Sequence, residues 1–314
     1  MLATQLTNVG NESQQSYEKL NPHDVVVFAT TFYKNWQSSQ TDITNADSAR
    51  GNASIDTFRQ AVEGDYQVVV VDGGSSKEYL ETLERMGVKV LAQEKPGMVE
   101  AKREALEKSV DLNPRVLLLI QAEKTEVIPY ISQLVDPIAR GEADIVMAGR
   151  DPSLFRTTYP SFQVESEEFG NRWCNRIAQH LGILPTDTQF DWFFGVKAFR
   201  NDPELVRMFM ERYQVDDPEW AKRRGGANPE RYTNFDFFPV LAALHSDRKV
   251  VGVDIPFSYP PKQKAMEETL AGDFIEKRRM QRETILVEVM QFARYLVDES
   301  NPKGHLSKQP SSNV

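Results

Sequence analysis

Cysteine is nearly absent from this chain, because Cys174 is the only one among 314 residues. A single cysteine forms no intrachain disulfide and excludes a cysteine-rich metal site. Long apolar runs are also missing: stretches such as Val116 to Ile120 are far shorter than the roughly 20 residues that cross a bilayer. Met1 to Asn21 is polar rather than signal-like. We therefore expect no transmembrane segment, a reducing compartment and, by default, a cytoplasmic location.

An excess of basic residues is lacking as well. The chain has 37 Lys and Arg against 46 Asp and Glu, which gives a formal charge of −9. This balance argues against a nucleic-acid partner, although a local basic patch can still hold a small phosphorylated ligand. Hydrophobic residues make up 40% of the chain and charged ones 26%. This is enough for a sizeable core in one large domain or two intimate ones.

Several common catalytic motifs are missing. The sequence has no Walker-type phosphate loop, no G-x-G-x-x-G, no G-x-S-x-G and no H-E-x-x-H. These absences exclude the usual P-loop, dinucleotide-binding, hydrolase and zinc-peptidase sites. The first expected strand is followed by Thr30-Thr31-Phe32 rather than by a glycine-rich stretch, which argues against a sugar-phosphate nucleotidyltransferase.

The first half of the chain alternates two kinds of pattern. Short apolar runs predict strands at Val25 to Ala29, Val68 to Val71, Val88 to Ala92, Val116 to Ile120 and Asp144 to Ala148. Helical patterns lie between them at Ala53 to Val62, Lys77 to Met86, Met98 to Val110 and Glu126 to Ala139. This alternation predicts an α/β fold, a mostly parallel sheet flanked by helices. Ligands then bind beyond the carboxyl ends of the strands.

The regular alternation of strand and helix patterns ends after Arg150. We expect helices at Glu167 to Leu181, Pro203 to Tyr213 and Asn234 to Leu244, strands at Trp192 to Phe199 and Val250 to Asp254, and a long C-terminal helix at Phe274 to Val297. That last helix can pack on the body or on a second subunit, which would make a homo-oligomer. Residues 1–21 read as a loose arm and residues 301–314 as a disordered tail.

The sharpest local signal is Asp72-Gly73-Gly74-Ser75, which follows a buried strand. An acid at a strand end can accept hydrogen bonds from a base or ribose, and glycine lets the backbone approach a ligand closely. The same residues suit a tight turn in which Asp72 or Ser75 caps the next helix. Local chemistry alone favours the turn.

The order of segments nevertheless resembles the family-2-like glycosyltransferases of the GT-A fold, nearest to soluble dolichyl-phosphate-mannose-synthase-like members. In that family a strand ending in Asp-Asp-Gly-Ser holds the nucleotide; here Asp72 stands at the first acid and Gly73 replaces the second. Further matches follow in order at Gly97 to Leu106, Gln121 to Glu123, Ala143 to Arg150, Asp191 to Arg200 and Val253 to Tyr259. The resemblance spans roughly residues 24 to 262.

The resemblance implies a hexosyltransferase that moves a sugar from a nucleotide-sugar donor to a hydroxyl-bearing acceptor. Residues 22–150 would bind the nucleotide sugar, residues 151–262 would form the acceptor side of the same domain, and residues 263–300 would be the C-terminal helix. The missing membrane helices favour a small or soluble acceptor. The residues expected to contact the donor are Thr30, Asp72, Gly73, Lys102, Gln121, Lys124 and Arg224.

Arg224 belongs to a basic loop, Lys222 to Gly226, which can act as a lid over the diphosphate or be a solvated loop. The segment Gln121-Ala122-Glu123 stands where the family has an Asp-x-Asp that holds Mg²⁺ or Mn²⁺. Glu123 can bind such a cation. Alternatively, Lys124 replaces its charge, the loop has lost catalysis, or Glu123 simply opens a helix. His245 is a second candidate metal ligand, although a lone histidine is more often structural.

Asp236, in Thr233 to Phe238, is the candidate general base, because inverting family members place a carboxylate in a comparable segment. An aromatic surround would raise its pKa by desolvation. Asn234 or Asp236 can instead cap a helix, and Asp191 is a rival base. The altered residues Gln121 and Gly73 keep another class open: a non-catalytic sugar-nucleotide-binding or scaffolding protein with a degenerate phosphate site.

Overall fold

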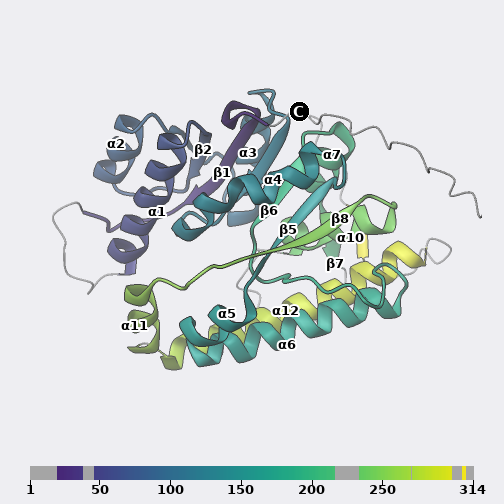
Figure 1. Ribbon diagram of the computed structural model, residues 1–314. Helices are drawn as coiled ribbons and strands as arrows, with labels where there is room; N and C mark the ends of the chain where they lie inside the picture. The colour runs from purple at the N-terminus through teal and green to yellow at the C-terminus, as the bar shows by residue number, and fades with distance from the viewer. Residues whose placement is uncertain (1–19, 38–45, 216–232, 270, 299–305, 309–314) are drawn as a thin grey trace, which may run out of the picture.

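The computed structural model describes residues 20–37, 46–215, 233–269, 271–298 and 306–308 (Figure 1). The predicted lid residue Arg224 and most of the predicted arm and tail lie outside the described residues. Leu306–Lys308, within the predicted tail, form strand β9, which pairs antiparallel with β7 (Tyr213–Val215).

Among the described residues, seven strands form one sheet in the order β3-β2-β1-β4-β6-β5-β8. Their bounds are Val25–Thr31 (β1), Gln67–Asp72 (β2), Lys89–Ala92 (β3), Val116–Leu119 (β4), Ile145–Arg150 (β5), Lys197–Arg200 (β6) and Val250–Ile255 (β8). Only β6 runs antiparallel to its neighbours. The inner strands β1, β2, β4 and β5 are buried on both faces, which is why their sequences are continuous apolar runs.

Helices cover both faces of the sheet (Figure 1). They are Ala46–Glu63 (α1), Lys77–Arg85 (α2), Met98–Val110 (α3), Ile131–Ala139 (α4), Pro152–Thr158 (α5), Ser161–His180 (α6), Pro203–Met210 (α7), Thr233–Asp236 (α9), Phe238–His245 (α10), Pro261–Thr269 (α11) and Ala271–Val297 (α12), with short 3₁₀ turns at Pro22–Asp24 (η1) and Thr125–Tyr130 (η2). Alternate residues of β1 enter two cores, with Val26 and Phe28 on one face and Val25 and Val27 on the other.

Several predicted elements differ in extent. The helices predicted to begin at Ala53 and Glu167 begin earlier, at Ala46 and Ser161, and the helix predicted at Asn234 to Leu244 is divided into α9 and α10. The helix predicted at Glu126 to Ala139 begins as the 3₁₀ turn η2, because Pro129 cannot donate an α-helical hydrogen bond. Of the strand predicted at Trp192 to Phe199, only the part from Lys197 onward joins the sheet; Gly195, at φ +82°, turns the chain before it. The helix predicted at Pro203 to Tyr213 ends at Met210.

The long helix α12 packs on the body of the protein beside α6 (Figure 1). Ile285, Val289 and Phe292 on its apolar face are buried in one of the two cores. Its apolar stripe is therefore accounted for within one chain. In the described part of the chain, no helix is both long and apolar enough to span a membrane.

Candidate functional site

A cavity of about 630 Å³ opens beyond the carboxyl ends of β1, β2 and β4. Parallel strands leave a crevice at this edge because their connections diverge there. Side chains of α6, α11 and α12 close it from the other side. Seven of the predicted site residues line this cleft: Thr30, Gly73, Lys102, Gln121, Glu123, Lys124 and Asp236.

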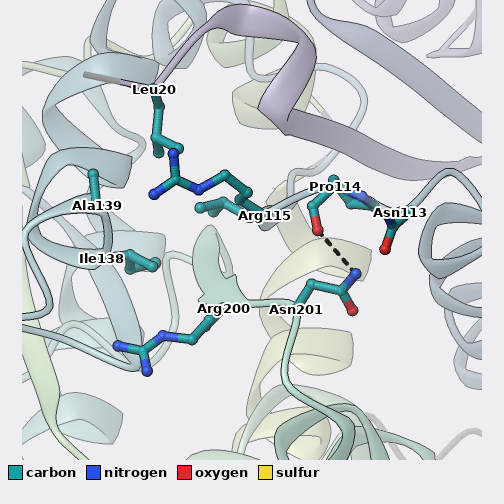
Figure 2. Close-up of a pocket in the computed structure, with 9 residues that line it drawn as sticks. Leu20, Asn113, Pro114, Arg115, Ile138, Ala139, Arg200 and Asn201 are labelled. Carbon is teal, nitrogen blue, oxygen red and sulfur yellow. Dashed lines mark hydrogen bonds between the residues drawn. The ribbon is translucent and has the colours of Figure 1, made fainter. Parts of the chain in front are cut away.

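A smaller cavity, of about 360 Å³, lies at the opposite edge of the sheet, near the starts of β1 and β4 (Figure 2). Arg115 and Arg200 line it, and the Asn201 side chain donates to the carbonyl oxygen of Pro114 at 2.9 Å. None of the predicted site residues lines this cavity. The larger cleft is therefore the candidate functional site.

Asp72 organises the turn that follows β2. One carboxylate oxygen accepts hydrogen bonds from the backbone N–H groups of Gly74 (2.8 Å) and Ser75 (2.7 Å). The other accepts from the Thr31 hydroxyl at 2.6 Å and from the Ser75 hydroxyl. These four bonds fill the acceptor capacity of a carboxylate. Asp72 thus shapes the edge of the cleft without lining it, and direct contact with a nucleotide stays a prediction.

Gly73 lets this turn lie against the loop after β1. Its N–H donates to the Thr31 carbonyl oxygen at 2.9 Å, and a Cβ here would lie 2.9 Å from Gln93 Oε1. Beside it, the ring of Phe32 lines the cleft and is 61% exposed. An exposed ring offers a stacking face to a planar ligand. The only sequence signal for this role is an aromatic residue immediately after a strand end.

Glu123 is held by Arg50, a residue that the sequence alone does not connect with it. The guanidinium of Arg50 contacts Glu123 Oε1 through Nε at 3.1 Å and Nη2 at 2.5 Å. Burial favours a higher pKa for Glu123, but the charge of Arg50 outweighs it and lowers the pKa below the ordinary value. Glu123 is therefore an ionised carboxylate in the loop after β4.

A single carboxylate holds a divalent cation only when the substrate supplies further oxygen ligands. Mg²⁺ is often held by one or two carboxylates together with substrate phosphates. Within the described residues, no group of three or more His, Cys, Asp and Glu side chains is placed to hold a metal ion. The donor set around Glu123 thus fits a cation that arrives with a diphosphate.

Lys124 lies buried at the base of the cleft. Its ammonium donates to the carbonyl oxygen of Phe194 at 2.7 Å and sits 3.9 Å from the centre of the Phe194 ring. Burial, reinforced by the nearby charge of Arg150, lowers the pKa of Lys124 to about 7. A diphosphate bound here would favour its protonated form.

Asp236 pairs with Lys102 across the cleft wall, with 2.6 Å between Lys102 Nζ and Asp236 Oδ2. Its other oxygen, Oδ1, is buried without a hydrogen-bond partner. Lys197 on β6 is fully buried, also lacks a partner, and has its pKa lowered by burial to about 8, an effect that the charge of Asp236 opposes. Asp236 therefore has one oxygen anchored by Lys102 and one without a partner among the described residues.

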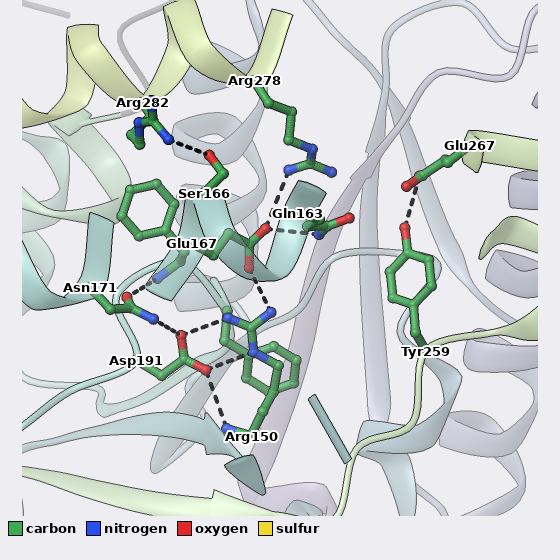
Figure 3. Close-up of polar contacts among 12 residues, drawn as sticks. Arg150, Gln163, Ser166, Glu167, Asn171, Asp191, Tyr259, Glu267, Arg278 and Arg282 are labelled. Atoms are coloured by element: carbon green, nitrogen blue, oxygen red, sulfur yellow. Dashed lines mark hydrogen bonds and ion pairs between the residues drawn. The ribbon is translucent and has the colours of Figure 1, made fainter. Parts of the chain in front are cut away.

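Asp191, the rival base, is bound into an ion-pair network beneath the cleft (Figure 3). Arg150 donates to both of its oxygens at 2.7 Å, and the Asn171 amide donates to one of them at 2.7 Å. Burial raises the pKa of Asp191, but Arg150 outweighs this and holds it below the ordinary value. Asp191 does not line the cleft, so this geometry favours a structural role over the predicted catalytic one.

His245 lies far from Glu123, so the two predicted metal ligands do not share one metal site. It is exposed at the end of α10, just before β8 begins at Val250. Val250 pairs with Ile145 at the start of β5, whereas the cleft residue Arg150 is at the other end of that six-residue strand. Such a strand is roughly 17–20 Å long. Helical periodicity does not reveal at which edge of a sheet a helix ends.

The sequence alone assigns no role to most residues of the cleft wall formed by α6 and α11. Gln163 on α6 and Gln263 and Glu267 on α11 are buried there, and Tyr259, which precedes α11, donates to Glu267 Oε1 at 2.8 Å (Figure 3). Gln163 donates to Glu167 at 2.8 Å, and Arg150 donates to the same carboxylate at 2.6 Å. This wall is therefore polar yet nearly sealed from solvent.

No protein-family model and no curated protein matches the chain. Among solved structures it is similar to glucosyl-3-phosphoglycerate synthase from Mycobacterium tuberculosis in complex with uridine-diphosphate: 13% identity, 92% of this chain and 86% of the other covered, TM-score 0.50. A second structure of that synthase, with phosphoglyceric acid, gives 12% identity, coverage of 87% and 79%, and a TM-score of 0.49. A third, with Mn²⁺, uridine-diphosphate-glucose and phosphoglyceric acid, gives 14%, 92% and 88%, and 0.48. The similarity to the complex with uridine-diphosphate confirms the GT-A-like fold predicted from the sequence.

Proposed function

We propose that this protein is a glycosyltransferase that moves a sugar from a nucleoside diphosphate sugar to a hydroxyl group of an acceptor. The observation that carries the proposal is one cleft, at the carboxyl ends of β1, β2 and β4, that gathers Gln121, Glu123, Lys124 and Asp236. The fold is shared with a synthase solved in complex with uridine-diphosphate, which supports a nucleotide donor.

The nucleoside belongs at the end of the cleft formed by the loops after β1 and β2. Thr30 and Gly73 line this end, and the exposed ring of Phe32 offers a stacking face for the base. Asp72 holds the turn in place through its four hydrogen bonds. A ligand at this end would contact the backbone of these two loops and the ring of Phe32, next to a turn that Asp72 already holds in place.

The diphosphate belongs next to Gln121 to Lys124, after β4. Glu123 would hold Mg²⁺ or Mn²⁺ together with diphosphate oxygens, and the bound cation supplies charge neutralisation for the leaving group. Arg50 orients Glu123 through its two contacts. The ammonium of Lys124 adds positive charge at the base of the cleft, where the low dielectric strengthens its attraction for the diphosphate.

Asp236 is the proposed general base. Lys102 anchors Oδ2, while Oδ1 has no partner in the described structure and accepts the proton of the acceptor hydroxyl. The acceptor oxygen forms the new bond to the anomeric carbon as the bond from that carbon to the diphosphate breaks. The displaced electron pair leaves with the nucleoside diphosphate.

A binding protein without catalysis is the second candidate. The observation that favours it is the amide of Gln121 together with the ion pair between Glu123 and Arg50, which leaves this position with a single, already paired carboxylate. Such a protein would bind the nucleotide sugar and leave it intact.

Nucleotide release separates the two candidates. Calorimetry with UDP and GDP identifies the base, and release of UDP or GDP from a panel of their sugars is then followed with and without Mn²⁺. A glycosyltransferase releases nucleotide slowly by hydrolysis and faster with an acceptor. Tight binding with no release across a broad acceptor panel would establish the binding protein instead, and no binding of any nucleotide would sink both.

A further inference from the structure

We propose that the wall of the cleft formed by α6 and α11 is the acceptor subsite and that it takes an uncharged polyhydroxylated molecule, a sugar or polyol. This inference rests on the proposed function and adds to it the chemical class of the acceptor. It depends on two buried oxygen atoms and on the balance of charge around them.

Gln163 Oε1 and Glu267 Oε2 are buried acceptors without a donor. Their residues are 5% and 4% exposed, both line the cleft, and neither atom has a hydrogen-bond partner in the described structure. The second polar atom of each terminal group is fixed by hydrogen bonds. The amide nitrogen of Gln163 donates to Glu167, while Tyr259 and Gln263 donate to Glu267 Oε1. The unpaired oxygens are thus held in position rather than free to turn away.

A buried acceptor left unpaired is destabilising, and more so when it is charged. Few such atoms occur in folded proteins, and they often indicate a missing ligand or water. A ligand that brings several hydroxyl donors satisfies both oxygens at once. Asp236, the proposed general base, also lines the cleft, and its Oδ1 is a third buried oxygen without a partner among the described residues.

These three oxygens come from α6, α9 and α11, all of which follow β5 in the chain. The residues proposed to hold the nucleotide come from the loops after β1, β2 and β4. Both sets line the same cleft. The oxygens that lack a hydrogen-bond donor therefore come from the second half of the chain and not from the loops proposed to hold the nucleotide.

The charges on this wall disfavour an anionic acceptor. Arg150 and Arg278 both pair with Glu167, and Arg150 also pairs with Asp191. Elsewhere in the cleft, Arg50 pairs with Glu123 and Lys102 with Asp236.

Glu267, by contrast, has no ion-pair partner among the described residues. Lys124, the remaining lysine of the cleft, donates to the carbonyl oxygen of Phe194 at 2.7 Å. A carboxylate or phosphate placed on this wall would therefore meet an unpaired negative charge.

The test uses matched acceptors with the wild-type protein and the sugar nucleotide chosen by calorimetry. Glucose is compared with glucose 6-phosphate, glycerol with glycerate, and phosphoglyceric acid is added as a further anion. We expect the neutral member of each pair to accelerate nucleotide release at least tenfold more than the anionic member. Faster release with the anions would overturn the inference while leaving sugar transfer itself established. Absence of nucleotide binding would overturn the proposed function and this inference with it.

Glu267→Gln replaces the unpaired oxygen by an N–H donor. We expect a rise of about tenfold or more in KM for the neutral acceptor, with the Kd for the nucleotide and for the intact donor unchanged. Glu268→Gln, an exposed neighbour on α11, is the matched control and should leave both constants unchanged. If Glu267→Gln weakened donor binding and spared the acceptor KM, the wall would hold the transferred sugar and the assignment would be wrong.

Discussion

Lys102 and Asp236 lie 134 residues apart in the sequence and 2.6 Å apart in the structure, where both are buried. The pairing leaves the other oxygen of this carboxylate, Asp236 Oδ1, without a hydrogen-bond partner among the described residues. Asp236→Asn keeps the shape and removes the base. We expect turnover to fall by about 10²- to 10⁴-fold while nucleotide affinity stays the same. Kinetics and calorimetry on one preparation check both halves of this prediction.

Asp187→Asn, on an exposed loop, is the control for this substitution. If Asp236→Asn retained normal turnover and Asp191→Asn lost it, Asp191 would be the base. Equal loss of nucleotide binding and turnover in Asp236→Asn would indicate a structural defect instead.

Glu123→Gln tests the cation. The amide cannot supply the negative oxygen that a hard cation prefers, so we expect the enhancement of UDP affinity by Mn²⁺ to fall by at least about tenfold, with affinity in EDTA little changed. Calorimetry with and without Mn²⁺ measures this directly. Glu126→Gln, exposed three residues further on, serves as the control. An undiminished Mn²⁺ effect would remove Glu123 from the cation site.

Lys124 predicts a dependence of nucleotide affinity on pH. Its pKa of about 7 in the free protein means that it is mostly neutral above that pH. Because a bound diphosphate favours the ammonium, binding above pH 7 takes up a proton and weakens as the pH rises. Calorimetry of UDP from pH 6 to 9, in two buffers with different ionisation enthalpies, counts that proton. In Lys124→Met the uptake should vanish; uptake that persists would assign it to another group.

Asp191→Asn is expected to act on stability rather than on the donor. It weakens the hydrogen bonds with Arg150, at a cost of about 2–3 kcal/mol in unfolding free energy at neutral pH. The folded pKa of Asp191 is below its unfolded value of about 3.9, so its contribution is present above that pH and is lost as the pH falls through the folded pKa. The difference from wild type should therefore shrink on acidification. Urea unfolding between pH 3 and 7 checks this; a constant difference contradicts it.

The strands of the first half are predictable because each is a continuous apolar run between turn residues. Their order also predicts the cleft, since parallel strands end at one edge. The partners within the cleft are not predictable in this way. Arg50 reaches Glu123 across 73 residues, and no spacing rule links a position in α1 with the loop after β4.

Asp191 and His245 show a second limit. Asp191 is a plausible general base and His245 a plausible metal ligand by residue type. Asp191 is nevertheless occupied by Arg150 and Asn171, and His245 lies at the opposite edge of the sheet. Residue type indicates what a side chain can do. Only the packing decides whether its lone pairs are still available and where it lies.

The antiparallel course of β6 between two parallel strands has a consequence for divergence. The chain leaves the sheet at the cleft edge after Arg150 and returns to the same edge at Lys197, and α5 and α6 are built within this excursion. Insertions and substitutions there reshape one wall without disturbing β2, which ends at Asp72, or the loop after β4, which holds Glu123. Under the proposed function, a change of acceptor would alter this wall and leave the proposed nucleotide end intact.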